Sequence, residues 1–342
     1  MTVYFDYIIG ALQSHGGVTV YFDNIVSRCI ERGVPSKLLL PNDVENKFGC
    51  ESLSLEKKTL QRYLKASFSL SNQDGYGIFH SSYYRLPSHK ELKVITTVHD
   101  FTYEKFIKGP AQWVHTWQKN RTIRNSDVVI CVSHNTAKDL MQYCPIDPKK
   151  IRVIHNGVSD SYHPLGGLSC GHHQDVVFVG ARSGYKNFKL AVESVATVAN
   201  LSLQIVGGGS LTKDEIKHLE RYLPNRYCWL GRLSDEELNQ TYNQAYALLY
   251  PSSYEGFGIP VIEALRAGCP VIAVNVSSIP EVAGDAAILV NEPTVAAFSD
   301  ALIKLPAIRK QLITAGLAQA AKFSWDRCFE ETLAVYNELL AK

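Results

Sequence analysis

The feature that most constrains the fold is a repeated alternation of short β-branched runs with longer helical patterns. In the first half of the chain the runs lie at residues 3–9, 37–40, 77–80, 93–98, 128–132 and 152–154. The alternation then stops and resumes with runs at 175–179, 203–206, 227–230, 246–250, 271–274 and 287–290. Strands that alternate with helices form parallel sheets. We therefore predict two α/β domains, each large enough to bury its own core.

Between the two series lies a glycine-rich segment, residues 165–174, in which no strand or helix period can be followed. We predict that it links a first domain, residues 1–164, to a second domain, residues 175–323. Residues 324–342 are expected to form a last helix, because large apolar side chains recur there at helical spacing. A new helix is also expected to begin after Pro306, since proline interrupts a helix from within.

Composition excludes several classes of protein. The 342 residues carry a net charge of +2, which is too small to indicate a nucleic-acid partner. The eight cysteines include no Cys-x-x-Cys pair, so a disulfide scaffold is not expected and a reducing cytoplasm fits best. No basic leader and no run of about 18 apolar residues is present, so we expect neither export nor a membrane span.

Cations and glycines follow two of the predicted strands in the second domain, where ligands bind in open α/β sheets. Arg182 and Lys186 lie in a glycine-containing loop ahead of a helix, which suits an anion such as a phosphate. Two solvated cations are the alternative. Gly207 begins a run of three glycines that would let a phosphate or a flat ring approach the backbone, although a plain loop explains it equally well.

The most informative stretch joins a strand end to a helix that a proline starts. It places Glu255 in the loop and Glu263 in the first turn of the expected helix, so both carboxylates could face one ligand. The amides of Phe257, Gly258 and Ile259 would point at the same place, where an oxyanion gains from the helix dipole. The alternative is that Glu263 only complements the dipole and Glu255 is solvated.

The first domain has parallel features. The paired glycines Gly16 and Gly17 precede an expected helix and could approach a diphosphate closely. His99 follows a predicted strand, where it could bind a polar substrate or serve as a satisfied structural histidine. In the linker, Cys170, His172 and His173 could recruit zinc, but a flexible segment is poorly preorganised for it and we expect no metal site.

Taken together, these residues resemble retaining glycosyltransferases of family 4, and the resemblance covers nearly the whole chain. Glu255 to Glu263 is similar to the Glu-x7-Glu element of that family. The sequence after Gly268 is similar to the mannosyltransferase-like branch that builds bacterial polysaccharides such as O-antigen and lipopolysaccharide. The other markers are the segments 16–18, 99–100, 132–133, 154–158, 180–186, 230–238, 268–273 and 277–287.

The resemblance implies an α/β fold of the GT-B class, with two Rossmann-like domains whose parallel sheets face a central cleft and a last helix that returns to the first domain. It implies a nucleotide-diphosphate sugar as co-substrate, a saccharide or lipid-linked saccharide as acceptor, and no other cofactor. It also implies transfer of mannose from GDP-mannose, with retention at the anomeric carbon by front-face attack. A UDP-sugar donor is the alternative.

The resemblance also implies a role for each site residue. Arg182 and Lys186 would neutralise the diphosphate, and Glu263 would bind the ribose. Glu255 and the amides of Phe257, Gly258 and Ile259 would hold the sugar. Gly207 and Leu233 would border the base, Gly16 and Gly17 would approach the diphosphate, and His99 would contact the transferred sugar.

Three other functions remain as alternatives. A nucleotide-sugar 2-epimerase shares the fold but lacks the combination of Arg182, Lys186 and the Glu255 loop. A non-catalytic subunit would not need the full set of site residues. A nicotinamide dehydrogenase would need a Gly-x-Gly-x-x-Gly after the first strand, which this chain lacks.

Charge is distributed unevenly. Residues 1–165 contain 20 Lys and Arg against 15 Asp and Glu, a net charge of about +5. Within them Trp113 and Trp117 have the spacing of one helix face, and basic residues lie on either side. This pattern fits either two core tryptophans with a solvated basic face or an element that associates peripherally with the inner face of an anionic membrane.

Overall fold

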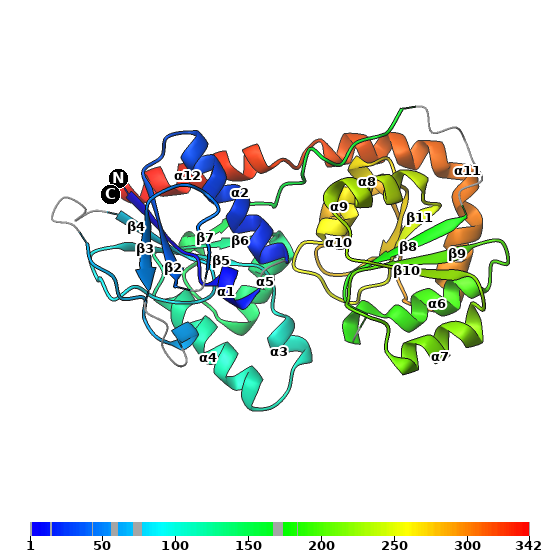
Figure 1. Cartoon of the computed structure of the whole chain (residues 1–342), viewed down its shortest axis with the longest axis horizontal. Helices are drawn as coiled ribbons and strands as arrows, with labels where there is room; N and C mark the ends of the chain where they lie inside the picture. Colours follow the sequence, from blue (N-terminus) through cyan, green and yellow to red (C-terminus); the bar gives the residue numbers. More distant parts are fainter. Residues whose placement is uncertain are drawn as a thin grey trace. The chain divides into compact units, whose positions relative to one another are not determined.

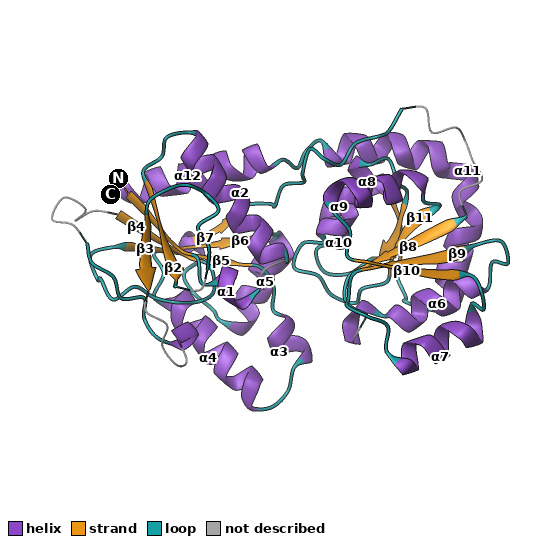
Figure 2. Cartoon of the chain, in the orientation of Figure 1, coloured by secondary structure: helices purple, strands orange, loops and turns teal. Residues whose placement is uncertain are grey.

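A computed structural model of the chain describes residues 2–13, 16–42, 44–55, 61–70, 77–166, 174–182 and 184–341. It divides into two compact units. The first consists of Met1–Gly157 with Trp325–Lys342, and the second is Val158–Ser324. Each unit contains one parallel sheet with helices packed against it (Figure 2), so the predicted pair of parallel-sheet α/β domains is confirmed. Most of the predicted linker, residues 167–173, lies outside the described residues, including the cysteine and histidines considered for zinc.

The first unit has a seven-stranded sheet in the order β3-β2-β1-β4-β5-β6-β7. Its strands are β1 (Thr2–Asp6), β2 (Ser36–Pro41), β3 (Ser52–Leu55), β4 (Gly77–Ser81), β5 (Lys93–Val98), β6 (Val128–Cys131) and β7 (Ile151–Val153). Its helices are α1 (Ile9–Leu12), α2 (Gly17–Glu31), α3 (Thr102–Phe106), α4 (Pro110–Arg124), α5 (His134–Tyr143) and α12 (Trp325–Leu340). The short edge strand β3 was not expected from the sequence, since its alternating Ser and Leu residues carry little β-branched signal.

The second unit has a six-stranded sheet in the order β10-β9-β8-β11-β12-β13. Its strands are β8 (Asp175–Val179), β9 (Ser202–Val206), β10 (Tyr227–Gly231), β11 (Ala247–Tyr250), β12 (Val271–Val274) and β13 (Ala287–Val290). Its helices are α6 (Phe188–Ala196), α7 (Lys213–Tyr222), α8 (Asp235–Gln244), α9 (Ile259–Arg266), α10 (Ile279–Ala283) and α11 (Val295–Ala320). In Figure 1, α6 and α7 lie on one side of this sheet and α8 and α9 on the other.

The segment that precedes the predicted linker packs against α8 of the second unit. The backbone N–H of His163 donates to Asn239 Oδ1 at 3.0 Å, and that of Leu165 donates to Asn243 Oδ1 at 2.7 Å. These bonds fix the chain to the second unit several residues before the glycine-rich segment begins. The structural boundary between the units therefore falls at Gly157, earlier than the composition of the sequence indicates.

The expectation of a new helix after Pro306 is wrong, because α11 runs without a break from Val295 to Ala320 with Pro306 inside it. A proline has no N–H to donate to the carbonyl four residues earlier, which here is Leu302. The hydroxyl of Tyr246 donates to this carbonyl at 2.7 Å and replaces the missing bond. The helix can therefore continue past the proline.

The last helix, α12, belongs to the core of the first unit and lies beside α2 (Figure 1). Trp325, Phe329 and Tyr336 are buried in that core. The Tyr336 hydroxyl also lies 2.7 Å from Nδ1 of His80 on β4. None of the described helices combines the length and apolar character needed to cross a bilayer.

Phe329→Ala is expected to lower the free energy of unfolding by about 3–5 kcal/mol, because it opens a cavity in a closely packed core. Asn337→Ala, an exposed position on the same helix, serves as the control and should change it by less than about 0.5 kcal/mol. Urea denaturation followed by circular dichroism measures both. Equal effects of the two substitutions would contradict the packing of α12.

Candidate active site

The second sheet has a topological switch point between β8 and β11, because the chain proceeds from β8 to β9 on one side and from β11 to β12 on the other. Ligands in open α/β sheets bind outside the carboxyl ends of the strands at such a point. Hydrogen bonds join the two loops that leave these strand ends. The N–H of Ser253 donates to the carbonyl of Tyr185 at 2.8 Å, and the side-chain amide of Asn187 donates to the carbonyl of Pro251 at 2.8 Å.

An ion pair links the same two loops. Lys186 Nζ lies 2.5 Å from Glu255 Oε1 and 3.2 Å from the hydroxyl of Tyr250. The side chains of Lys186 and Glu255 are 14% and 12% exposed, so both charges are largely withdrawn from water yet still accessible. The structure thus brings together two of the residues that the sequence analysis selected.

Arg182 is positioned differently from the expectation that it presents its guanidinium to a ligand. Its side chain is 3% exposed, and Nε donates to Glu215 at 3.0 Å. Nη1 donates to the carbonyl of Gly207, and Nη2 donates to the carbonyls of Gly209 and Ser210, at 2.8 to 3.0 Å. Four of its five N–H donors are therefore used within the protein. Its assignment as a diphosphate ligand remains a prediction, and in this structure it anchors the loop after β9.

The loop after β9 is shaped around that arginine. Gly207 and its two following glycines all have left-handed backbone conformations, with φ of 81°, 73° and 71°. A Cβ atom at Gly208 would lie 2.5 Å from Nη1 of Arg182 and 2.9 Å from the carbonyl oxygen of Gly180. No other residue type fits there without displacing the arginine. The three glycines therefore do more than close a plain loop.

The start of α9 forms the other wall of the candidate site. Gly258 is the N-cap in the left-handed region at φ 100°, Ile259 is the first helical residue, and Phe257 is buried. Two adjacent serines hold the loop: the Ser278 hydroxyl lies 2.9 Å from the carbonyl oxygens of both Glu255 and Phe257. The Glu255 N–H donates to Ser277 Oγ at 2.9 Å. The backbone of this loop is thus fixed before any ligand binds.

Glu263 lies in the second turn of α9 and not in its first turn, because the helix begins two residues earlier than predicted. Burial, together with the nearby Asp235 carboxylate, raises the pKa of Glu263 to about 8. The Tyr242 hydroxyl donates to Glu263 at 3.4 Å, and that of Tyr162 donates to Asp235 at 3.1 Å. The carboxyl therefore belongs to a hydrogen-bonded group with two tyrosines that the sequence analysis missed.

The raised pKa of Glu263 predicts a pH-dependent stability. Between about pH 4.5, the ordinary value, and pH 8, the folded chain retains a proton that the unfolded chain has lost, so stability falls as pH rises. Glu263→Gln removes this dependence. The unfolding free energy of Glu263→Gln minus that of the wild type should therefore increase as pH rises, by up to about 1.4 kcal/mol per pH unit across this window.

Urea denaturation at several pH values measures the effect, with the exposed Glu292→Gln as a matched control. If the difference in unfolding free energy between Glu263→Gln and the wild type does not vary with pH, the pKa of Glu263 is not raised in the folded chain.

The other residues predicted for the site also lie in loops after strands or at the starts of helices. Leu233 is half-buried just before the cap of α8. In the first unit, Gly16 caps α2 and Gly17 is its first residue. His99 follows β5 and packs edge-on against Tyr21 of α2, with ring centroids 5.1 Å apart.

Burial lowers the pKa of His99 to about 4, so the imidazole is neutral at physiological pH. Its Nε2 atom is buried and has no hydrogen-bond partner among the described residues. An unpaired buried polar atom is costly, and a ligand group that hydrogen-bonds to it would remove that cost. The placement fits the expected contact with a polar substrate, which remains a prediction.

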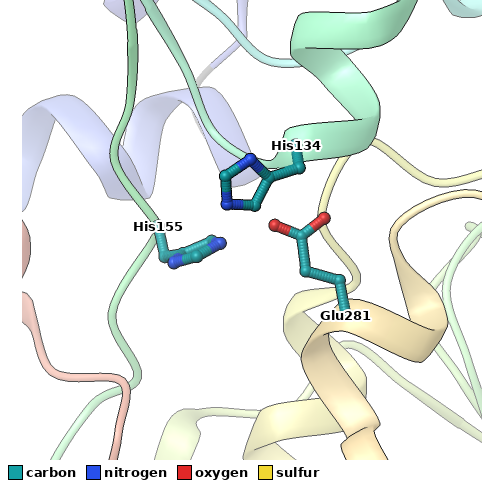
Figure 3. A group of neighbouring side chains, drawn as sticks. All are labelled: His134, His155 and Glu281. Carbon is teal, nitrogen blue, oxygen red and sulfur yellow. The ribbon is translucent and has the colours of Figure 1, made fainter.

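Two further histidines, His134 and His155, lie close together in the first unit (Figure 3). His134 is the first residue of α5 and His155 follows β7, and their ring centroids are 5.9 Å apart. Glu281, which Figure 3 also labels, belongs to α10 of the second unit. The two histidines follow β6 and β7, which pair in parallel, and this explains why they are neighbours. That the site needs no metal remains a prediction.

Known proteins show the same division of the chain. The family profile "Glycosyltransferase Family 4" matches residues 15–162, and the profile "Glycosyl transferases group 1" matches residues 171–316. O-antigen chain mannosyltransferase B of Escherichia coli is 26% identical over 313 residues, which cover 84% of this chain and 81% of that protein.

Solved structures share the fold over the whole chain. Sucrose-phosphate synthase from Thermosynechococcus elongatus is similar with a TM-score of 0.79 at 19% identity. The alignment covers 100% of this chain and 99% of the synthase chain. Anabaena Alr3699/HepE in complex with UDP and glucose has a TM-score of 0.73 at 13% identity, with 98% of each chain covered. The fold is GT-B, as expected. The chain is an enzyme, a glycosyltransferase.

Proposed function

We propose that this enzyme transfers mannose from GDP-mannose to a saccharide or lipid-linked saccharide acceptor, with retention at the anomeric carbon. The observation that carries the proposal is the pair of Lys186 and Glu255 across the switch point of the second sheet. A cation and a carboxylate held together there suit a donor that has a diphosphate next to a polyhydroxylated ring. The glycosyltransferase profiles at both halves of the chain support the reaction class.

The chemistry follows from where charge develops. When the glycosidic bond breaks, negative charge accumulates on the diphosphate, and Lys186 with the N–H groups at the start of α9 would stabilise it. Lys186 then exchanges its contact with Glu255 for one with the phosphate, and Glu255 becomes available to accept hydrogen bonds from the sugar hydroxyls. The acceptor attacks from the face that the diphosphate leaves, and a departing phosphate oxygen takes its proton.

Mannose is supported by the similarity to an O-antigen chain mannosyltransferase, and GDP is proposed as its nucleotide carrier. A UDP-sugar is the second candidate donor, because a structure of the same fold was solved with UDP and glucose. A thermal-shift panel of nucleoside diphosphates and their sugars distinguishes the two. Ligand at 100 times its Kd adds about 2.7 kcal/mol to stability, so the preferred base stands out.

Lys186→Ala and Glu255→Ala are each expected to lower the rate of transfer by about 10²–10³, the usual cost of one such contact. Lys189→Ala, which removes an exposed lysine three residues away on α6, serves as the matched control and should retain wild-type activity. Product formation followed by NMR gives the rate and the anomeric configuration together. Near-wild-type turnover in either site variant would remove that residue from the site, and inversion would contradict the proposed mechanism.

Transfer is also expected to be independent of divalent metal, because Lys186 and helix N–H groups take the part of a cation at the diphosphate. Activity should therefore be unchanged by excess chelator. Loss of activity on chelation, recovered with Mg²⁺ or Mn²⁺, would contradict this assignment.

We further propose that the enzyme works in the cytoplasm, at the inner face of the membrane that holds a lipid-linked acceptor. The eight cysteines include no Cys-x-x-Cys pair, and so sparse a set is typical of a chain in a reducing compartment. The enzyme is isolated from its own cell, denatured and treated with a maleimide label. Labelling of all the cysteines would support a reducing compartment. Disulfides in the protein isolated from its cell would contradict it.

A further inference from the structure

Helix α4 has its polar and apolar faces reversed relative to an ordinary surface helix. The residues that it buries include His115, Gln118 and Lys119. Its large apolar residues face outward instead, with Trp113 70% exposed and Trp117 58% exposed. The interpretation of these tryptophans as core residues is therefore wrong. A helix with this arrangement lacks the usual reason to pack on a core.

A polar network fixes the orientation of α4. Lys119 donates to Glu104 Oε2 at 3.2 Å and to the carbonyl of Asp100 at 2.5 Å, and its Nζ lies 3.5 Å from the centre of the Phe101 ring. The side chains of Lys119 and Glu104 are 1% and 3% exposed. Turning the tryptophans inward would carry Lys119 out into water and leave the Glu104 carboxylate of α3 buried without its partner, which costs several kcal/mol. The tryptophans therefore remain outside.

The exposed apolar surface continues beyond α4 itself. Phe106, at the end of α3, is 41% exposed, and Ile107 next to it is 38% exposed. Val114, beside Trp113, is 43% exposed. Gln112 of α4 donates to the backbone of α3, so the end of α3 lies against the start of α4. These residues, with Trp113 and Trp117, are named the α4 face.

The charge around the α4 face is positive. Within residues 102–143 the acidic side chains are Glu104, Asp127 and Asp139. Glu104 and Asp139 are buried against lysines, and Asp127 lies 3.5 Å from a lysine on β5. Outside these pairs, the exposed basic residues of the same segment are Lys108, Arg124 and Lys138, and the guanidinium of Arg121 lies over the ring of Trp117 at 5.4 Å.

We propose that the α4 face docks on the surface of an anionic lipid bilayer. Tryptophan side chains favour the boundary between headgroups and acyl chains, and basic residues beside them are attracted to anionic headgroups. A protein partner would also bury the tryptophans, but the exposed Lys108 and Arg124 beside them favour a surface of negative charge. The inference goes beyond the transfer reaction and does not depend on which donor the enzyme uses.

Vesicle binding tests the proposal with the whole enzyme. Co-sedimentation is measured with vesicles of phosphatidylcholine alone and of phosphatidylcholine mixed with phosphatidylglycerol. The enzyme is expected to bind only the anionic vesicles and to be released at high salt, because the Debye length shortens from about 10 Å at 0.1 M to about 3 Å at 1 M. Tryptophan emission should shift to shorter wavelength on binding.

Substitutions on the α4 face separate its two contributions. Trp113→Ser with Trp117→Ser is expected to abolish sedimentation, while Ile303→Ser, at a 63% exposed site on α11, leaves it unchanged. Lys108→Gln and Arg124→Gln should each weaken binding about fivefold, as expected for roughly 1 kcal/mol per charge. The exposed Lys304→Gln is the control for charge. Far-ultraviolet circular dichroism, the thermal midpoint of unfolding and donor binding should be unchanged in every variant.

Three results would overturn the proposal. The first is no binding to anionic vesicles at low salt, and the second is binding that the paired tryptophan substitution does not change. The third is a concentration-dependent dimer, detected by light scattering and lost in that variant, which would assign the α4 face to a second copy of the chain. Donor binding that persists in any of these cases separates failure of this proposal from failure of the proposed function.

Discussion

The ion pair between Lys186 and Glu255 is the interaction on which the candidate site depends. It joins the loops after β8 and β11, the two neighbouring strands at which the connections of the second sheet diverge. Because both side chains are largely buried, neither can lose its partner without cost unless another charged group takes its place. In the proposed function a diphosphate sugar supplies these replacements: its phosphate takes the place of Glu255 beside Lys186, and its hydroxyls take the place of Lys186 beside Glu255.

The surrounding backbone is built to hold that pair in place. Arg182 donates most of its N–H groups to carbonyls of the glycine loop after β9. The hydroxyl of Ser278 lies within hydrogen-bonding distance of two carbonyls in the loop that carries Glu255. These bonds are internal and need no ligand. They hold in place the N–H groups at the start of α9, which are proposed to face the diphosphate. Donors that are already in place need not rearrange during the reaction, and their electrostatic stabilisation of the transition state is then largest.

The sequence predicts the fold and the places of the site residues for one physical reason. In parallel sheets, loops that follow strands meet at one edge, so residues found after strands are neighbours in the structure. Lys186 and Glu255 were identified in this way. What could not be predicted depends on partners distant in sequence: Glu215 for Arg182, Tyr242 for Glu263, and Tyr246 for the carbonyl freed by Pro306. The reversed faces of α4 follow from the same cause, since Glu104 and the Asp100 carbonyl make burial of Lys119 favourable.

The roles of Lys186 and Glu255 are tested most directly by calorimetry on the wild type, Lys186→Ala and Glu255→Ala. Each form is titrated with GDP and GDP-mannose, and with UDP and UDP-glucose in parallel. The proposed exchange of partners at Lys186 predicts that Lys186→Ala weakens binding of the nucleoside diphosphate and of its sugar alike. It predicts that Glu255→Ala weakens binding of the sugar nucleotide alone and leaves the affinity for the diphosphate equal or higher, because Lys186 no longer has to leave a partner. Equal loss of both ligands in Glu255→Ala, or unchanged affinity for the diphosphate in Lys186→Ala, would contradict it.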